Sequence, residues 1–319
     1  MPVNLDKPHL WKTDITKSVD MYNEWFLNFA PKAFRETRVQ AISDVEATLE
    51  KTNNLADVSP TVLRENPGVL SALRMSTCPP LAVDRLIGLA GVKGSLVHTM
   101  ESAQKLPVLL RGSELDIELR KIGSIIKRMA DPDIFVWLGR AEPPIDTEIH
   151  RAATIVADRL CGSIANPIIR NAQEKRQLAV IKDWLEARQY RYLPPGSGTK
   201  FDNLAPGTFS FHTNVPVRME GNRQVNIPAD IAIMPKLAKK GELPLLIEAK
   251  SAGDFTNVNK RRKEEATKMN QLRDTYGHDI RFNLFLCGYF DSGYLGYEAA
   301  EGIDWVWEHG IDDLSSFGL

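Results

Sequence analysis

The chain has 319 residues, of which 43% are hydrophobic and 25% are charged, and its formal net charge is −1. This composition is typical of a globular protein with one or two domains, and the near-neutral charge argues against a general nucleic-acid coat. There is no apolar run long enough to span a membrane, no secretory signal and no CxxC pair among the three cysteines, so we expect a cytoplasmic protein without disulfides or structural zinc.

The charges are unevenly distributed along the chain. Residues 166–200 carry seven Lys or Arg against three Asp or Glu, and residues 250–263 carry five against one. Residues 298–313 carry six acidic residues and no Lys or Arg. A folded chain with this segregation can present a locally basic surface to a phosphate backbone, although each run taken alone could equally be a solvated face.

The N-terminal half is predicted to be mostly helical, with breaks at Pro and Gly. Apolar residues at helical spacing follow Pro31, which suits the first turn of a helix that we expect to begin there. Residues 1–160 contain no recognisable catalytic pattern, and we expect them to form a helical N-terminal region. Further helices are expected over residues 82–90, 115–129, 147–160 and, as a long amphipathic segment, 166–190.

After a Gly- and Pro-rich loop at residues 194–200, the apolar period changes to two. Three strands are predicted in succession, then a helix and a further apolar strand. This order predicts an α/β (α+β) domain with a mixed sheet over residues 161–319. The strands are expected over residues 209–217, 224–234, 242–251 and 282–290, and the helix over residues 256–275.

The second and third of these strands place two acids side by side. If their connection folds symmetrically about residue 239, Asp230 faces Glu248 on one side of the sheet, with Cβ atoms about 5 Å apart. Lys250 projects to the same side, because side chains alternate along a strand. Apolar residues occupy the other side and can be buried. The pattern therefore predicts two acids and a lysine at the end of an apolar hairpin.

Two carboxylates at that distance repel unless a positive charge lies between them. A divalent cation such as Mg²⁺ satisfies both, acidifies a bound water and offsets charge on a phosphate oxygen, while Lys250 can orient the water or stabilise the anionic transition state. These are the requirements of phosphodiester hydrolysis. A Glu-x-Lys triplet also arises by chance in a chain of this length, so the alternative is an ordinary charged pair on an exposed edge strand.

These residues resemble a known signature. Pro228-Ala229-Asp230 followed by Glu248-Ala249-Lys250 looks like the PD-(D/E)xK nuclease pattern, with Ala229 inserted before the aspartate. Glu174 matches the additional acid that many such nucleases place beside the metal, although it could instead pair with Arg170 or Arg176 on its own helix. The segments NPIIRNAQEKRQ, PADIAIMP and LLIEAKSAGDFTNVNKRRKEEATKMNQLR resemble the XamI-type restriction endonucleases over most of the chain.

The resemblance implies a prokaryotic type II restriction endonuclease with a PD-(D/E)xK core. It implies a Mg²⁺ cofactor, for which Mn²⁺ can substitute, held by Asp230 and Glu248, with Lys250 and Glu174 also in the catalytic site. The expected product ends are 5′-phosphate and 3′-hydroxyl, and the expected site is a short palindrome such as a GTCGAC-like hexamer. Expected partners are double-stranded DNA, a second copy of the chain, and a DNA methyltransferase that acts on the same site without a stable complex.

The segment after Lys250 is the leading candidate for DNA contact. Its short polar residues and four consecutive basic residues can reach base edges and phosphates, whereas residues 263–268 fit a solvated Lys/Glu helix surface better. Tyr190, Arg191 and Tyr192 are weaker candidates. Two alternatives stay open: a repair or structure-specific nuclease of the same superfamily, and a non-catalytic DNA-binding protein on this fold. The DNA-binding candidates are Asn257, Asn259, Lys260, Arg261 and Arg262.

Overall fold

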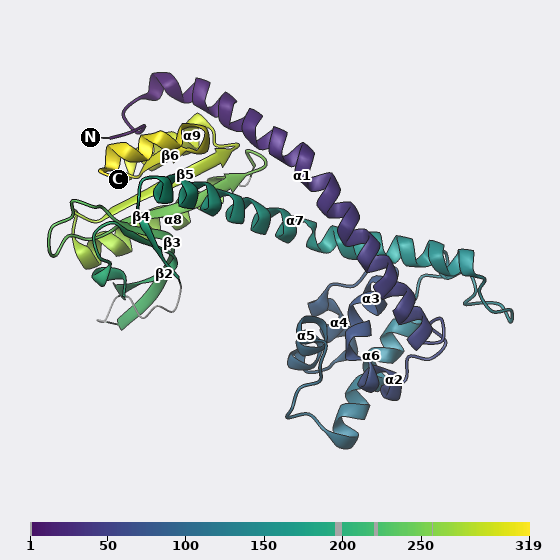
Figure 1. The fold of residues 1–319 in the computed structure, drawn as a ribbon. Coiled ribbons are helices and arrows are strands. Elements are labelled where there is room, and N and C mark those ends of the chain that lie inside the picture. The colour runs from purple at the N-terminus through teal and green to yellow at the C-terminus, as the bar shows by residue number, and fades with distance from the viewer. Residues whose placement is uncertain (1, 195–199, 220–222, 257) are drawn as a thin grey trace. The chain divides into compact units, whose positions relative to one another are not determined.

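A computed structural model describes residues 2–194, 200–219, 223–256 and 258–319 (Figure 1). The chain divides into two compact units. Met1–Phe29 and Ile169–Leu319 form one, which we call the sheet unit, and Ala30–Ile168 form the other, which we call the helical unit. The helical unit is therefore an insertion between two parts of the sheet unit. Among the described residues, none of the helices combines the length and the apolar character needed to cross a bilayer.

Two long helices contribute to both units. They are α1 (Pro8–Lys51) and α7 (Asp146–Ala187), and each contains an internal proline, Pro31 and Pro167 respectively. The prediction that a helix begins at Pro31 is wrong, because α1 begins at Pro8. The two segments expected as separate helices on either side of residue 163 are likewise one helix. A proline inside a helix removes one backbone hydrogen bond, and both helices nevertheless continue past their proline.

The helical unit packs shorter helices around α1 and α7. Its core is one continuous apolar cluster, in which Leu73, Leu119 and Phe135 are fully buried. The predicted helices at residues 82–90 and 115–129 are confirmed as α4 and α6. The shorter elements are α2 (Pro60–Glu65), η1 (Pro67–Val69), α3 (Leu70–Met75), α4 (Val83–Ala90), α5 (Gly94–Ala103) and α6 (Gly112–Met129).

The sheet unit contains a six-stranded mixed sheet in the order β1-β2-β3-β4-β5-β6. The pairs β2–β3 and β3–β4 are antiparallel, and the pairs β1–β2, β4–β5 and β5–β6 are parallel. The predicted mixed α/β sheet is therefore confirmed. The strands are β1 (Arg191–Leu193), β2 (Thr208–Met219), β3 (Arg223–Met234), β4 (Leu245–Ala252), β5 (Arg281–Gly288) and β6 (Asp304–Trp307).

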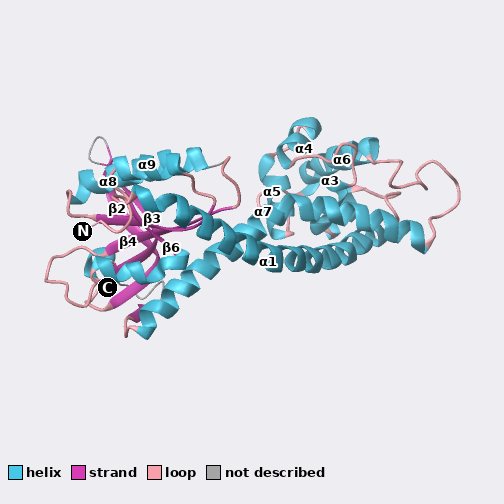
Figure 2. Cartoon of the chain, turned by 90° about the horizontal axis from the view of Figure 1, so that it is seen from above, coloured by secondary structure: helices cyan, strands magenta, loops and turns pink. Residues whose placement is uncertain are grey.

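Both faces of this sheet are covered by helices (Figure 2). One face packs against α8 (Val258–Tyr276) and α9 (Ser292–Ala300), and the first turns of α1 add Trp11 and Ile15 to the same core. The other face packs against the end of α7 and against η4 (Glu308–Phe317). The alternative of a charged pair on a sheet open to water therefore does not apply. A short helix, η2 (Phe201–Asn203), precedes β2.

The N-terminal segment is fixed to the last strand of the sheet. The buried carboxylate of Asp304 accepts hydrogen bonds from the backbone N–H groups of Val3, Asn4 and Leu5. The Asn4 side chain donates to the carbonyl of Trp305 at 2.9 Å. An ionised acceptor makes stronger hydrogen bonds than a neutral one, so a single aspartate holds the start of the chain in the sheet unit.

Candidate active site

The β3–β4 hairpin has the predicted register. Ile231 pairs with Ile247 and Ile233 pairs with Leu245. One further step in this register places Asp230 opposite Glu248. At that point the Asp230 side chain turns to the neighbouring strand, where its Oδ2 accepts the backbone N–H of Ala249 at 2.8 Å. Elementary strand geometry therefore brings the two acids together.

The converging side chains line a cavity of about 260 Å³. Asp230 comes from β3, Glu248 and Lys250 from β4, and Glu174 from α7, so the structure brings together all four residues expected in the catalytic site. Arg170, one helical turn before Glu174, also lines this cavity. A larger cavity of about 650 Å³ lies at the connection between β3 and β4 and contains none of these residues. We therefore assign the candidate site by its chemistry rather than by its volume.

Strand β2 is kinked at His212. This residue has a φ of 51°, the left-handed region that few residues other than glycine adopt. Phe209 and Phe211, which precede it, pack in the core beneath α7, whereas Val215 and Val217 pack in the core on the opposite face. Odd-numbered side chains of β2 therefore point to one face of the sheet before His212 and to the opposite face after it.

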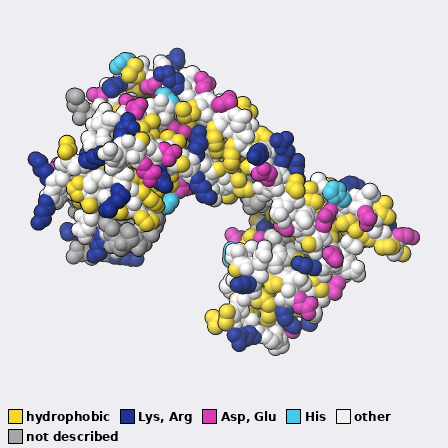
Figure 3. Space-filling model, viewed as in Figure 1, with side chains coloured by type: hydrophobic (Ala, Val, Ile, Leu, Met, Phe, Trp, Pro, Cys, Tyr) yellow, Lys and Arg dark blue, Asp and Glu magenta, His cyan; other side chains and the backbone are white. Residues whose placement is uncertain are grey.

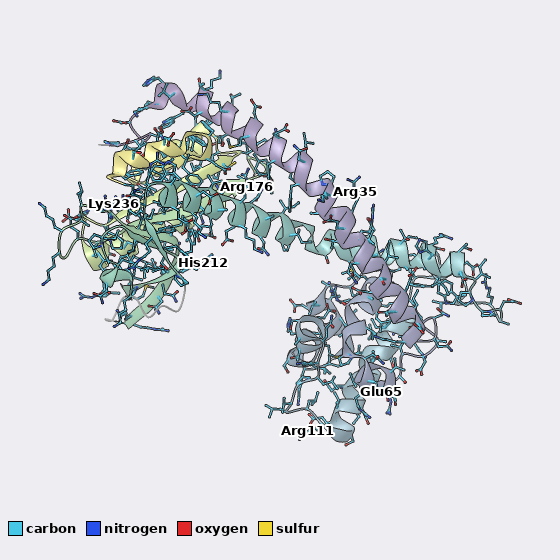
Figure 4. The ribbon with its side chains drawn as sticks, in the orientation of Figure 1. Arg35, Glu65, Arg111, Arg176, His212 and Lys236 are labelled. Atoms are coloured by element: carbon cyan, nitrogen blue, oxygen red, sulfur yellow. The ribbon has the colours of Figure 1, made fainter. Side chains whose placement is uncertain are left out.

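His212 adds a donor that the sequence analysis did not identify. His212 is labelled in Figure 4. Its register neighbours place it opposite Asp230, and its Nδ1 lies 3.9 Å from Oε1 of Glu174. Ligand atoms of Glu174, His212 and Asp230 all lie within 4.8 Å of one another. Glu174 therefore faces this cluster, and the charged side chain nearest to it among those described is His212. Arg176 instead pairs with Glu308 at 2.9 Å.

Each carboxylate oxygen of Glu248 contacts a lysine. Lys250 Nζ lies 3.0 Å from Oε1 and Lys268 Nζ lies 2.8 Å from Oε2. Burial alone would raise the pKa of the Glu248 carboxyl, but the two ammonium charges outweigh that effect and lower it. Burial would likewise lower the pKa of Lys250, but Glu248 and Glu265 raise it overall. Both groups are therefore charged at neutral pH.

Asp230 lies in a different electrostatic environment. Burial, followed by the negative charge of Glu248, raises the pKa of Asp230 to about 6. The hydrogen bond from Ala249 and the charges of Lys250 and Lys268 act in the opposite direction and are weaker. Ionisation of Asp230 is unfavourable without a metal, so a bound cation would stabilise its carboxylate form strongly.

The expectation that residues 263–268 form a solvated surface is confirmed for Lys263, Glu264 and Thr267, which are exposed, but is wrong for Glu265 and Lys268. Glu265 is only 2% exposed, and the Lys268 side chain is 17% exposed. Lys268 also donates to the backbone carbonyl of Pro228 at 2.8 Å, which ties α8 to the start of the signature. The Lys/Glu pattern was misleading because long charged side chains can lie along a covered face when each finds a partner there.

Gln177 of α7 fixes the strand that carries the lysine. Its side-chain amide donates to the backbone carbonyls of Lys250 and Phe285, both at 3.3 Å, and the residue is 1% exposed. The two carbonyls belong to adjacent strands, β4 and β5. A single buried side chain therefore holds the backbone of the candidate site against α7.

Comparison with known proteins identifies the family of the chain. The family model described as XamI restriction endonuclease matches residues 53–307. The type II restriction enzyme SalI of Streptomyces albus G is 52% identical over 316 residues, which is 99% of each chain. The chain belongs to the XamI restriction endonuclease family. It is accordingly a restriction endonuclease, a site-specific DNA hydrolase, and family membership favours that reading over the repair and non-catalytic alternatives.

One solved structure of another protein was matched to this XamI-family chain. Protein VC1899 from Vibrio cholerae is 17% identical, and the similarity covers 80% of this chain and 55% of that one, with a TM-score of 0.28. A TM-score this low carries no argument about fold or function. The assignment therefore depends on the family match and on the SalI relative.

The donor set of the XamI-family site fits a divalent cation. Asp230 and Glu174 supply the carboxylate oxygens that Mg²⁺ and Mn²⁺ prefer. His212 is a nitrogen donor, which suits transition metals better than Mg²⁺. Both oxygens of Glu248 contact ammonium groups, so this residue could bind a metal only by giving up one of those contacts.

The predicted DNA-binding residues fall outside the side chains that the structure describes. Asn257 lies outside the described residues altogether, and the side chains of residues 258–262, which include Asn259, Lys260, Arg261 and Arg262, are likewise not described. Among the weaker candidates, Tyr190 is buried and Tyr192 packs on Phe209 and Phe211. On the face shown in Figure 3, Lys and Arg side chains are interspersed with Asp and Glu.

Proposed function

We propose that this restriction endonuclease cuts both DNA strands at a short palindrome in a Mg²⁺-dependent reaction, leaving 5′-phosphate and 3′-hydroxyl ends. The observation that carries the proposal is the convergence of Asp230, Glu248, Lys250 and Glu174 on one cavity. Identity of 52% with the SalI enzyme over nearly the whole chain supports a GTCGAC-like hexamer as the site. Mn²⁺ is expected to substitute for Mg²⁺.

Each residue has a distinct part in this proposal. Asp230 and Glu248 hold the cation and Glu174 assists from α7, which matches the hard oxygen donors that Mg²⁺ requires. When bound, the cation acidifies a water and offsets charge on the phosphate. The ammonium group of Lys250 stabilises the negative charge that develops on the attacked phosphate and orients the water. His212 lies close enough to Glu174 to orient that carboxylate.

A palindromic site is matched by a two-fold symmetric protein, so we propose a homodimer. The helical region over residues 1–160 would serve dimerisation, DNA clamping or both. The residues proposed to contact base edges and phosphates are Asn257, Asn259, Lys260, Arg261 and Arg262. A methyltransferase acting on the same site would protect the host DNA.

The test is digestion of plasmid DNA with purified protein and Mg²⁺, followed by run-off sequencing of the ends. We expect discrete fragments that share one palindromic site. Asp230→Ala should abolish cleavage while keeping sequence-specific binding in Ca²⁺. Asp183→Ala is the matched control, because Asp183 is an exposed aspartate of α7 that does not line the cavity. Near-normal cleavage by Asp230→Ala, or intact DNA with wild-type protein in both Mg²⁺ and Mn²⁺, would contradict the proposal.

A further inference from the structure

A pair of buried carboxyl groups lies behind Lys250. Glu265 of α8 is 2% exposed and Glu298 of α9 is fully buried. Oε1 of Glu265 and both carboxyl oxygens of Glu298 are buried without a hydrogen-bond donor among the described residues, and the charge of Glu265 acts on Glu298. Two ionised carboxylates both accept hydrogen bonds and neither can donate, so a hydrogen bond between them requires a proton on one of them. The site described above uses neither group for metal binding. The question is therefore which one is protonated and what the pair does.

The neighbours of the two groups differ. Glu265 accepts a hydrogen bond from the Tyr294 hydroxyl at 2.7 Å, and its Oε1 lies 3.6 Å from Lys250 Nζ, so a donor and a cation both lie beside it. The charges acting on Glu298 are those of Glu265 and Glu301, both negative. Burial, followed by the charge of Glu265, raises the pKa of Glu298 to about 9. The proton therefore resides on Glu298, which can donate it to Glu265 in a hydrogen bond.

Lys250 lies between two carboxylates, Glu248 at 3.0 Å and Glu265 at 3.6 Å. Glu248 also contacts Lys268 and is a proposed metal ligand, so it cannot be reserved for Lys250. Glu265 has no such second task. Lys250 and Lys268 already face the carboxyl groups of Asp230, Glu248 and Glu265, so an ionised Glu298 would add a fourth negative charge at a fully buried position.

We propose that Glu265 is a positioning residue for Lys250, and that Glu298, as a neutral carboxylic acid, holds Glu265 in place by donating a hydrogen bond. The pair connects three elements, β4, α8 and α9, at the amine required for cleavage. This inference rests on the proposed function, in which the ammonium group of Lys250 is required for cleavage.

Four variants test the inference: Glu298→Gln, Glu298→Leu, Glu265→Gln and, as a reference, Lys250→Ala. Glutamine keeps a donor of the same size at position 298, whereas leucine fills the space without one. In single-turnover cleavage with Mg²⁺, we expect Glu298→Gln to stay within about twofold of wild type. Glu298→Leu and Glu265→Gln should each be slower by about tenfold or more, the effect of about 1.4 kcal/mol on the barrier. The DNA affinity of Glu298→Leu and Glu265→Gln, measured in Ca²⁺, should equal that of wild type.

Equal rates for Glu298→Gln and Glu298→Leu would overturn the inference, because the donor would then be irrelevant. A wild-type rate for Glu265→Gln would also overturn it. If Glu298→Leu fails to fold, the infrared C=O band of a protonated carboxylic acid gives an independent readout. The band should be present in wild-type protein near pH 8 and absent in Glu298→Gln, and its absence from wild type would reject a neutral Glu298. Cleavage by Lys250→Ala would instead contradict the proposed function itself.

Discussion

Asp230→Asn should stabilise the apo protein at neutral pH even though it removes a proposed metal ligand. Asp230 is mostly buried beside Glu248, and its pKa of about 6 in the folded chain exceeds the ordinary value of 3.8. The folded state is therefore penalised when this group ionises. The difference corresponds to at most about 3 kcal/mol, since each pKa unit is worth about 1.4 kcal/mol. Because part of the side chain faces the open cavity, we expect about 1–3 kcal/mol.

The pH dependence gives the sign of the effect. Below the ordinary pKa the carboxyl is protonated in both folded and unfolded chains, so the penalty is absent. It grows as the pH rises from about 4 to about 6 and is complete above that range. Asparagine cannot ionise, so the free energy of unfolding of Asp230→Asn relative to wild type should increase over the same interval.

The measurement is urea-induced unfolding in EDTA at about pH 4.5 and about pH 7.5, with the exposed variant Asp183→Asn as the control. Addition of Mg²⁺ should stabilise the wild type and leave Asp230→Asn nearly unchanged, because only the wild type binds the cation tightly. A variant that is less stable than wild type at about pH 7.5, or a difference that is the same at both pH values, would refute the reasoning.

Three further substitutions follow from the packing around the site. Gln177→Leu leaves one backbone carbonyl on each of β4 and β5 without its donor, and should lower the free energy of unfolding by about 1–3 kcal/mol in chemical denaturation. Gly288→Ala should unfold the sheet unit or prevent its expression. The φ of Gly288 is 99°, and a Cβ there would lie 2.1 Å from the carbonyl oxygen of Ala252. A normal melting temperature of the variant would show this reasoning to be wrong. Lys268→Met removes one of the two ammonium groups that lower the pKa of Glu248, so that pKa should rise. The cleavage rate of the variant should therefore fall more near pH 6 than the rate of wild type does. Superimposable pH–rate profiles would exclude this role of Lys268.

The sequence was sufficient to predict the part of the site that depends on strand geometry. Alternation with period two and a symmetric connection bring Asp230 opposite Glu248 and put Lys250 on the same side, and the structure has that register. Strands β1 and β6, with three and four residues, are too short to show any period, and they were not predicted. Each joins the sheet by pairing with one adjacent strand, β1 with β2 and β6 with β5.

The residues that approach the site from other elements could not be predicted in the same way. Glu265 and Lys268 are three positions apart on α8, which is also the pattern of an ordinary solvated helix, and only the packing of α8 on the sheet distinguishes the two cases. His212 has no sequence signal, because its left-handed backbone arises inside a regular strand pattern. Pro31 was read as a helix start, although Pro8 satisfies the same rule.

The attachment of the N-terminus to Asp304 bears on how the protein is made. Asn4 and Asp304 are 300 positions apart, so the first segment leaves the ribosome long before its acceptor is synthesised. The inserted helical unit, Ala30–Ile168, can fold during that interval, since domains generally fold as they emerge. The strands bearing the acids and the lysine come later, and the buried anchor for the start of the chain comes later still. The candidate active site is thus completed only after the helical unit has been synthesised, and a nascent chain released before that point would lack it.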